Sequence, residues 1–168
     1  MRRQIQGEWN FLMKNNSRIC VCAVLTAFCG ILMWVHGSMA PWIYRYVAEV
    51  PFTPVFTVFF LAWLLLYGLT GFIMGIFLLP VCFRSQQGLR CSVLCGLSFI
   101  LMLAWYPLFF SVLHGFLAFL TLFCAFLINI CLTVCTSRYL KIVTPFCIFT
   151  ALLEIYFLYV TIAFILLN

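Results

Sequence analysis

The sequence predicts an all-α membrane protein, a bundle of five transmembrane helices. Of its 168 residues, 67% are hydrophobic and only 7% are charged, so a water-soluble fold could not hide the apolar side chains. The apolar runs reach about 20 residues or more, the length that a helix needs to cross a bilayer. They are too long for barrel strands, and a helix satisfies its own backbone hydrogen bonds in lipid.

Polar residues divide the chain into five apolar segments within a single domain, residues 1–168. We expect helices at about 19–37, 53–80, 88–111, 115–136 and 144–167. The start of the second segment is the best marked, because Pro54 favours the first turn of a helix and pushes Thr53 toward extended geometry. The loop before it would then cover the mouth of the bundle.

Basic residues predict the orientation of the bundle. Eight of them flank one side: Arg2, Arg3, Lys14, Arg18, Arg84, Arg90, Arg138 and Lys141. The other side has only Arg45. By the positive-inside rule the N-terminus is cytoplasmic and the C-terminus outside, and we expect an integral multi-pass protein of a bacterial cell membrane. The net charge of +6 is therefore explained by the orientation of the helices in the membrane. It favours membrane lipids as partners and not nucleic acid.

Aromatic residues form a stripe on the second predicted helix. Phe56, Phe59, Trp63 and Tyr67 recur at spacings of three and four, which places them on one face. At about 1.5 Å per residue, Trp63 lies roughly 15 Å deep and Trp105 of the third helix roughly 9 Å deep. Such a face either lines a pocket for a flat apolar ligand or packs helices together. Shallower aromatic residues fit an interfacial belt: Trp34, Trp42, Tyr44, Tyr46 and Tyr106.

Glu154 is the only acidic residue inside a predicted span, close to the middle of the fifth helix. A carboxylate there costs on the order of 3 kcal/mol, so we expect it to be protonated or hydrogen-bonded. One interpretation is a carboxyl that binds a proton or a ligand. The other is an interhelical hydrogen bond, for example to Asn129. A lone carboxyl cannot supply paired acid and base chemistry, so no catalytic residue is predicted.

Three further patterns bear on ligands and partners. His36 and His114 lie on the predicted outside, where they are either solvated or available to a porphyrin metal or as a pH switch. The ten cysteines include no CxxC pair, and no histidine lies on the predicted cytoplasmic side, where many of them fall. No metal site made of protein ligands is therefore predicted. Gly71 and Gly75 allow close approach of another helix, within the bundle or in a homodimer.

Several segments, in order and spacing, resemble one known family. The second predicted helix carries Phe52-Thr53-Pro54, Val58-Phe59, Ala62-Trp63 and Leu66-Tyr67, which is similar to the W-[TN]-P-P…VF…W…LY signature of the TspO/MBR family, the tryptophan-rich sensory and translocator proteins. Further similarities are Tyr44 in the first loop, Trp105 to Phe110 at the end of the third helix, and Tyr159 to Thr161 with the closing Leu167-Asn168. The resemblance extends over nearly the whole chain.

That resemblance implies a small membrane receptor that binds porphyrins, haem or, in some members, sterols in a cavity closed by the first loop, often as a dimer. The pocket candidates it implies are Tyr44, Phe52, Pro54, Trp63 and Trp105. Two further candidates for the ligand site come from the patterns described above: Tyr67 from the aromatic stripe and Glu154 as the carboxyl within a predicted span.

The chain departs from the family at several positions: Phe52 and Leu153 replace tryptophans, Val55 a proline and Met102 an asparagine, and the family's P-Y-x-x-W of the fifth helix is here residues 149–153, FTALL. Met102 and Leu153 therefore also belong to the predicted ligand site. Because pocket tryptophans are the residues to which the family's porphyrin breakdown is attributed, we expect ligand binding without catalysis and without a required cofactor. The alternative is a transporter of a hydrophobic or cationic solute with Glu154 as its protonatable site. A tetrapyrrole-modifying enzyme is the third interpretation.

Overall fold

The computed structural model describes residues 2–38, 56–110, 112 and 114–167, and within these ranges it contains helices and no strand. Five helices are long: α2 Asn16–Ser38, α4 Phe56–Phe77, α6 Gln86–Phe110, α7 Gly115–Tyr139 and α8 Thr144–Leu167. The predicted all-α, five-helix fold is thus confirmed. Each long helix is apolar enough to cross a membrane.

Apolar side chains cover the outside of the bundle. Examples are Phe28 of α2, Ile100 of α6 and Phe116 of α7, which are more than half exposed. Soluble monomers rarely expose such continuous apolar surface, whereas lipid solvates it. The chain is therefore an integral multi-pass membrane protein.

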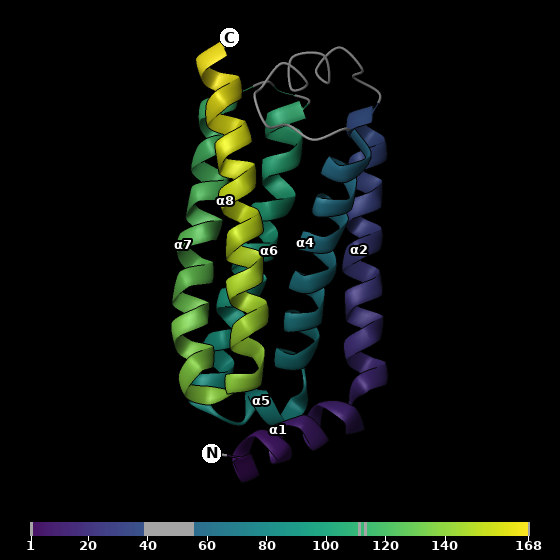
Figure 1. Ribbon diagram of the computed structural model, residues 1–168, viewed down its shortest axis with the longest axis vertical. Coiled ribbons are helices and arrows are strands. Elements are labelled where there is room, and N and C mark those ends of the chain that lie inside the picture. The colour runs from purple at the N-terminus through teal and green to yellow at the C-terminus, as the bar shows by residue number, and fades with distance from the viewer. Residues whose placement is uncertain (1, 39–55, 111, 113, 168) are drawn as a thin grey trace.

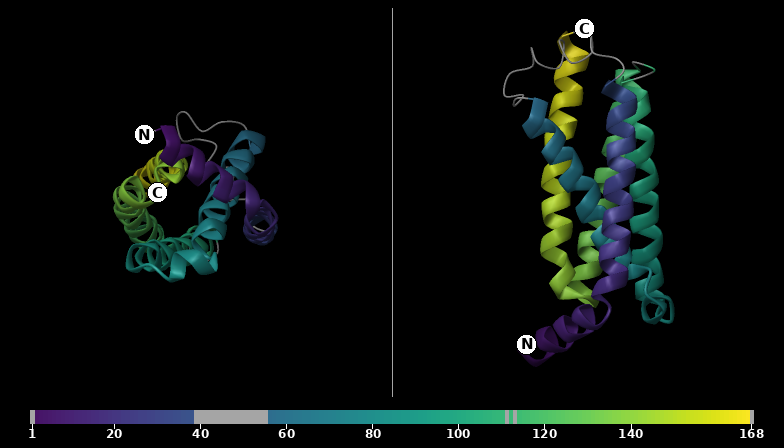
Figure 2. Two further views of the ribbon diagram at one scale, coloured as in Figure 1. Left: turned by 90° about the horizontal axis from the view of Figure 1, so that it is seen from below. Right: turned by 90° about the vertical axis from the view of Figure 1, so that its right-hand side faces the viewer.

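The five long helices run side by side along the long axis of the molecule (Figure 1). Seen from the end, α4, α6, α7 and α8 surround a common centre and α2 lies outside α4 (Figure 2). In agreement, α6 packs on α7, α7 on α8, and α4 on both α6 and α8. α2 contacts α4 along much of its length and also touches α6.

Two glycines of α4 allow α2 to pack closely. A Cβ at Gly71 would lie 2.7 Å from Thr26 Cβ, and one at Gly75 would lie 3.0 Å from Ile19 Cα. Within this chain, therefore, α2 occupies the small-residue face that the sequence indicated. A homodimer through Gly71 and Gly75 would have to displace α2.

Helix boundaries differ modestly from the predicted ones. The second span was expected to continue to Pro80, but α4 ends at Phe77 and Pro80 begins the short helix α5, Pro80–Phe83. Proline lacks the N–H that a helix interior needs but suits a first turn, and extended Leu79 precedes it with ψ 137°. The predicted start at Thr53 and Pro54 lies outside the described residues.

An additional helix, α1 (Arg2–Lys14), lies across one end of the bundle (Figure 1). The sequence predicts a tail here, because these 13 residues carry four charges and do not form an apolar run. Leu12 is buried against the bundle while Trp9 and Met13 on another face are about half exposed. Glu8 Oε2 accepts a hydrogen bond of 3.1 Å from Ile142 N, in the 3₁₀ turn η1 (Lys141–Val143).

The end that carries α1 is called the basic end below, because Arg84, Arg90, Arg138 and Lys141 also lie there. Buried residues form two groups along the bundle. The group nearer the basic end is aliphatic and cysteine-rich, with Ile76, Cys95 and Cys147 among its members. The group in the other half is aromatic, and it contains most of the described candidate site.

Candidate functional site

Five rings from three helices form the centre of the aromatic half, here called the aromatic cluster: Trp63 and Tyr67 of α4, Trp105 and Tyr106 of α6, and Phe157 of α8. The Trp63 ring centroid lies 4.7 Å from that of Tyr67, 5.0 Å from Trp105, 5.1 Å from Tyr106 and 5.3 Å from Phe157. Three members of the predicted stripe form a buried face, because Phe59, Trp63 and Tyr67 are at most 2% exposed; the side chain of Phe56 lies outside the described residues.

The polar atoms of the cluster bond to neighbouring helices. Trp63 Nε1 donates to Gly30 O (3.3 Å), Tyr67 Oη to Met102 O (3.2 Å), Trp105 Nε1 to Thr161 Oγ1 (3.2 Å) and Tyr106 Oη to Trp34 O (3.3 Å). These distances are at or beyond the long end of the usual range for such donors. The cluster is thus held by packing together with four long, weak hydrogen bonds.

One hydroxyl beside the cluster has no such bond. Tyr156 Oη is buried without a hydrogen-bond partner, and its ring lies 6.4 Å from Phe59 and 5.4 Å from Phe157. An unpaired buried polar group costs about 1–3 kcal/mol. Tyr156 therefore offers hydrogen-bonding capacity that the protein itself does not use.

The structure brings four of the predicted site residues together, since Trp63, Tyr67, Met102 and Trp105 are all at most 1% exposed in the same core. Their side chains pack so closely that almost none of their surface is exposed. A ligand among them would have to separate α4 from α6 or α8. Leu153 packs at the edge of this core. The remaining loop candidates, Tyr44, Phe52 and Pro54, lie outside the described residues.

Glu154 belongs to a separate polar cluster, about one turn of α8 closer to the basic end than Phe157. Its side chain is 1% exposed. Asn129 Nδ2 of α7 donates to Glu154 Oε2 at 3.0 Å and to Thr150 Oγ1 at 2.9 Å. The interhelical hydrogen bond that the sequence suggested is therefore present.

Two oxygens of this polar cluster remain without a partner: Glu154 Oε1 and Asn129 Oδ1. Both are acceptors when the carboxyl is ionised. A proton on the carboxyl would supply one donor and would also remove a buried charge, which is costly in a membrane span. The arrangement can hold a proton or accept a hydrogen bond from a ligand.

The assignment of Trp34 and Tyr106 to an interfacial belt was wrong. Trp34 is 7% exposed and Tyr106 is fully buried, because both side chains pack on α4, Trp34 against Phe60 and Tyr106 against Trp63. The other belt candidates, Trp42, Tyr44 and Tyr46, lie outside the described residues.

Sequence reasoning missed Gly30, Tyr156 and Phe157. A Cβ at Gly30 would lie 3.0 Å from Tyr67 Cγ, so this glycine lets the Tyr67 ring lie against the backbone of α2. Its carbonyl also receives the Trp63 bond. Both contacts join residues more than thirty positions apart, so no local sequence pattern predicts them. For Phe157, the spacing of three and four from Glu154 and Thr161 was a usable signal.

Histidine and cysteine form no metal cluster in the described part of the chain. His114 is exposed just before α7, and the side chain of His36 lies outside the described residues.

The fold and the site define a class: a five-span α-helical membrane protein with an aromatic core in one half of the bundle and a buried carboxyl near its middle. Comparison with known protein families, curated proteins and solved structures finds no match. The family resemblance therefore depends on the motifs described above.

Proposed function

We propose that this protein is a TspO-like membrane receptor that binds a porphyrin-like or other flat hydrophobic molecule within its bundle, without catalysing its conversion. The observation that supports this most directly is the aromatic cluster with the unpaired Tyr156 hydroxyl at its edge. Flat apolar ligands favour aromatic walls with few polar groups. Ligand entry exchanges ring–ring contacts for ring–ligand contacts, and the long hydrogen bonds of the cluster oppose this only weakly.

Titration of the purified protein with protoporphyrin tests the proposal. We expect a saturable shift in porphyrin absorbance together with quenching of tryptophan fluorescence. Trp63→Phe should weaken binding, whereas Trp9→Phe, on half-exposed Trp9 of α1, should leave affinity unchanged. A wild-type titration without saturation, or equal affinities for the two variants, would exclude the aromatic cluster as the site.

Tyr156 gives a second, more specific comparison. Tyr156→Phe removes only the unpaired hydroxyl, so stability should be retained or rise. Affinity should fall about five- to tenfold if that hydroxyl bonds the ligand, the value of one hydrogen bond. Tyr159→Phe, on the same helix but 40% exposed, is the matched control. Unchanged affinity in Tyr156→Phe would remove Tyr156 from the binding site.

A second candidate function is transport of a hydrophobic or cationic solute, with Glu154 as the protonatable site. The supporting observation is the buried carboxyl with one oxygen unpaired beside the unpaired Asn129 Oδ1. Uptake into proteoliposomes should then depend on pH and should lose that dependence in Glu154→Gln. Transport that kept its pH dependence in this variant would contradict coupling at Glu154.

The orientation follows from the same charges as before. We propose that the basic end faces the cytoplasm of a bacterial cell and that the C-terminus faces outside, by the positive-inside rule. A C-terminal alkaline phosphatase fusion should be active, and a C-terminal fluorescent-protein fusion dark. The opposite pattern would reverse the orientation.

A further inference from the structure

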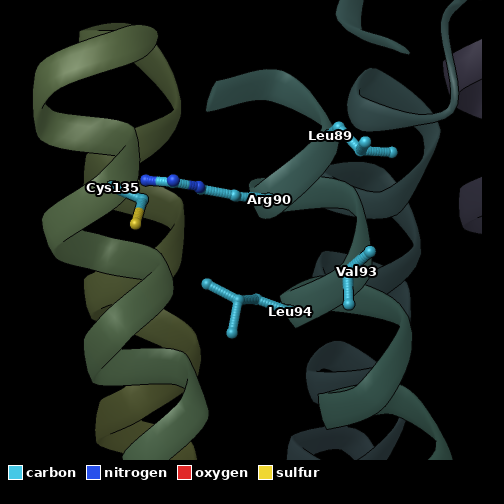
Figure 3. Close-up of a pocket in the computed structure, with 5 residues that line it drawn as sticks. All are labelled: Leu89, Arg90, Val93, Leu94 and Cys135. Carbon is cyan, nitrogen blue, oxygen red and sulfur yellow. The ribbon is translucent and has the colours of Figure 1, made fainter. Parts of the chain in front are cut away.

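An apolar pocket opens between α6 and α7 near the basic end. It has a volume of about 400 Å³ and is lined by Leu89, Arg90, Val93 and Leu94 of α6 and Cys135 of α7. Figure 3 shows Arg90 and Leu94 extending from α6 toward α7, with Cys135 facing the tip of Arg90. Apart from the guanidinium, the lining consists of carbon and sulfur.

A smaller pocket of about 100 Å³ adjoins it and is more polar. Its lining residues are Gln87, Arg90, Cys135 and Arg138, so Arg90 and Cys135 border both spaces. Together the two pockets form one amphipathic groove, defined by Gln87, Leu89, Arg90, Val93, Leu94, Cys135 and Arg138. Two guanidinium groups mark its polar part.

These two guanidinium groups have no counter-charge within the described residues: the side chains of Arg90 and Arg138 make no hydrogen bond or ion pair there. Glu8 is the described acidic residue at the same end, and its Oε2 accepts a hydrogen bond from Ile142 N. Guanidinium groups bind phosphate through paired, charge-assisted hydrogen bonds. The polar part of the groove is thus complementary to an anion.

The charged part of the groove lies nearer the end of the bundle than its apolar part, as the phosphate of a phospholipid lies nearer the membrane surface than its acyl chains. At about 1.5 Å per residue, Arg90 lies roughly 6 Å from the start of α6 and Leu94 roughly 12 Å. Arg138 lies in the last turn of α7. The guanidinium groups therefore sit near the membrane surface, and the apolar wall continues from them toward the interior.

We propose that this groove binds an anionic phospholipid, with its phosphate between Arg90 and Arg138 and an acyl chain along Leu89, Val93 and Leu94. Basic pockets between transmembrane helices are suited to anionic headgroups. A free phosphate would use only the small polar pocket and leave the larger apolar one empty. The site is independent of the aromatic cluster and of the ligand proposed above.

Native mass spectrometry of the full-length protein, after exchange into phosphatidylglycerol and phosphatidylcholine with identical acyl chains, tests this. The wild type should retain phosphatidylglycerol in preference. Arg90→Gln combined with Arg138→Gln should lower that retention about tenfold or more, since each basic residue near the surface contributes to anionic-lipid attraction. Arg84→Gln is the matched control, because Arg84 is exposed at the same end but does not line the groove.

Leu94→Asn tests the acyl-chain part, because it makes the wall polar while both guanidinium groups remain. It should also weaken phosphatidylglycerol retention. Equal retention of the two lipids, or equal losses in the double variant and in Arg84→Gln, would overturn the proposal. Displacement of the lipid by millimolar inorganic phosphate, with Leu94→Asn unchanged, would also overturn it, because the site would then recognise phosphate alone. All three arginines are exposed, and unchanged thermal unfolding of the variants verifies folding.

Discussion

Replacing Gly71 with alanine tests the packing of α2 on α4, which fixes the position of Gly30 beside the aromatic cluster. The added Cβ would lie 2.7 Å from Thr26 Cβ and 2.9 Å from Cys22 O. The first neighbour is a Cβ atom, whose position follows the backbone and does not change with the side-chain rotamer. The second is a backbone carbonyl, so α2 itself must shift.

Two opposing terms set the size of the effect. Overpacking of this kind costs about 1–3 kcal/mol, while alanine gains about 0.5–1 kcal/mol over glycine in a helix interior. We therefore expect a net loss of up to about 2.5 kcal/mol. Gly68→Ala, three residues earlier, has nothing within 4 Å of its new Cβ. It experiences only the favourable term and should be as stable as the wild type or slightly more so.

Unfolding in mixed micelles with increasing sodium dodecyl sulfate, followed by tryptophan fluorescence, measures this difference. Gly71→Ala should unfold at a lower denaturant fraction than Gly68→Ala. Equal midpoints would refute the close contact between α2 and α4. A loss of dimer without a loss of stability in Gly71→Ala would instead indicate that the glycine face joins two copies of the chain.

Two further predictions concern buried polar groups. In a double-mutant cycle of Asn129→Ala and Glu154→Ala, we expect a coupling free energy of about 0.6–2 kcal/mol from their hydrogen bond; strictly additive losses of unfolding free energy would contradict the bond. Burial raises the pKa of the Cys82 thiol, so at any given pH less of it is the reactive thiolate. In single-cysteine variants, Cys82 should therefore react with maleimide far more slowly at pH 7.5 than exposed Cys20, and its rate should keep rising at higher pH. Equal rates at pH 7.5 would show that Cys82 is accessible.

Much of the site could be predicted because its signals are local. The stripe of Phe59, Trp63 and Tyr67 repeats at helical spacing, so one buried face followed directly from the period of a helix. Glu154 was conspicuous because a carboxyl in a span needs a partner. Asn129 was a reasonable partner since it is a polar residue at comparable depth in the preceding helix.

Other parts of the site depend on contacts between distant segments. The contact of Gly30 with Tyr67 and the burial of Tyr106 depend on which helices are neighbours, and apolar composition alone does not specify neighbours in lipid, where packing and not hydrophobicity drives helix association. α1 was missed for a different reason. Its apolar residues, such as Leu12, occupy only one face, so its average composition resembles that of a polar tail.

The sequence by itself determined that the chain resides in a lipid bilayer, that it is helical and how many spans it has, because long uncharged apolar runs are stable in a bilayer as helices. It also placed a carboxyl and an aromatic face within the spans. Only the tertiary structure decided that the rings of Trp63 and Trp105 pack on each other and that α2 fills the Gly71 face. It alone brought Arg90 and Arg138 to one groove, because this arrangement requires α6 and α7 to lie side by side.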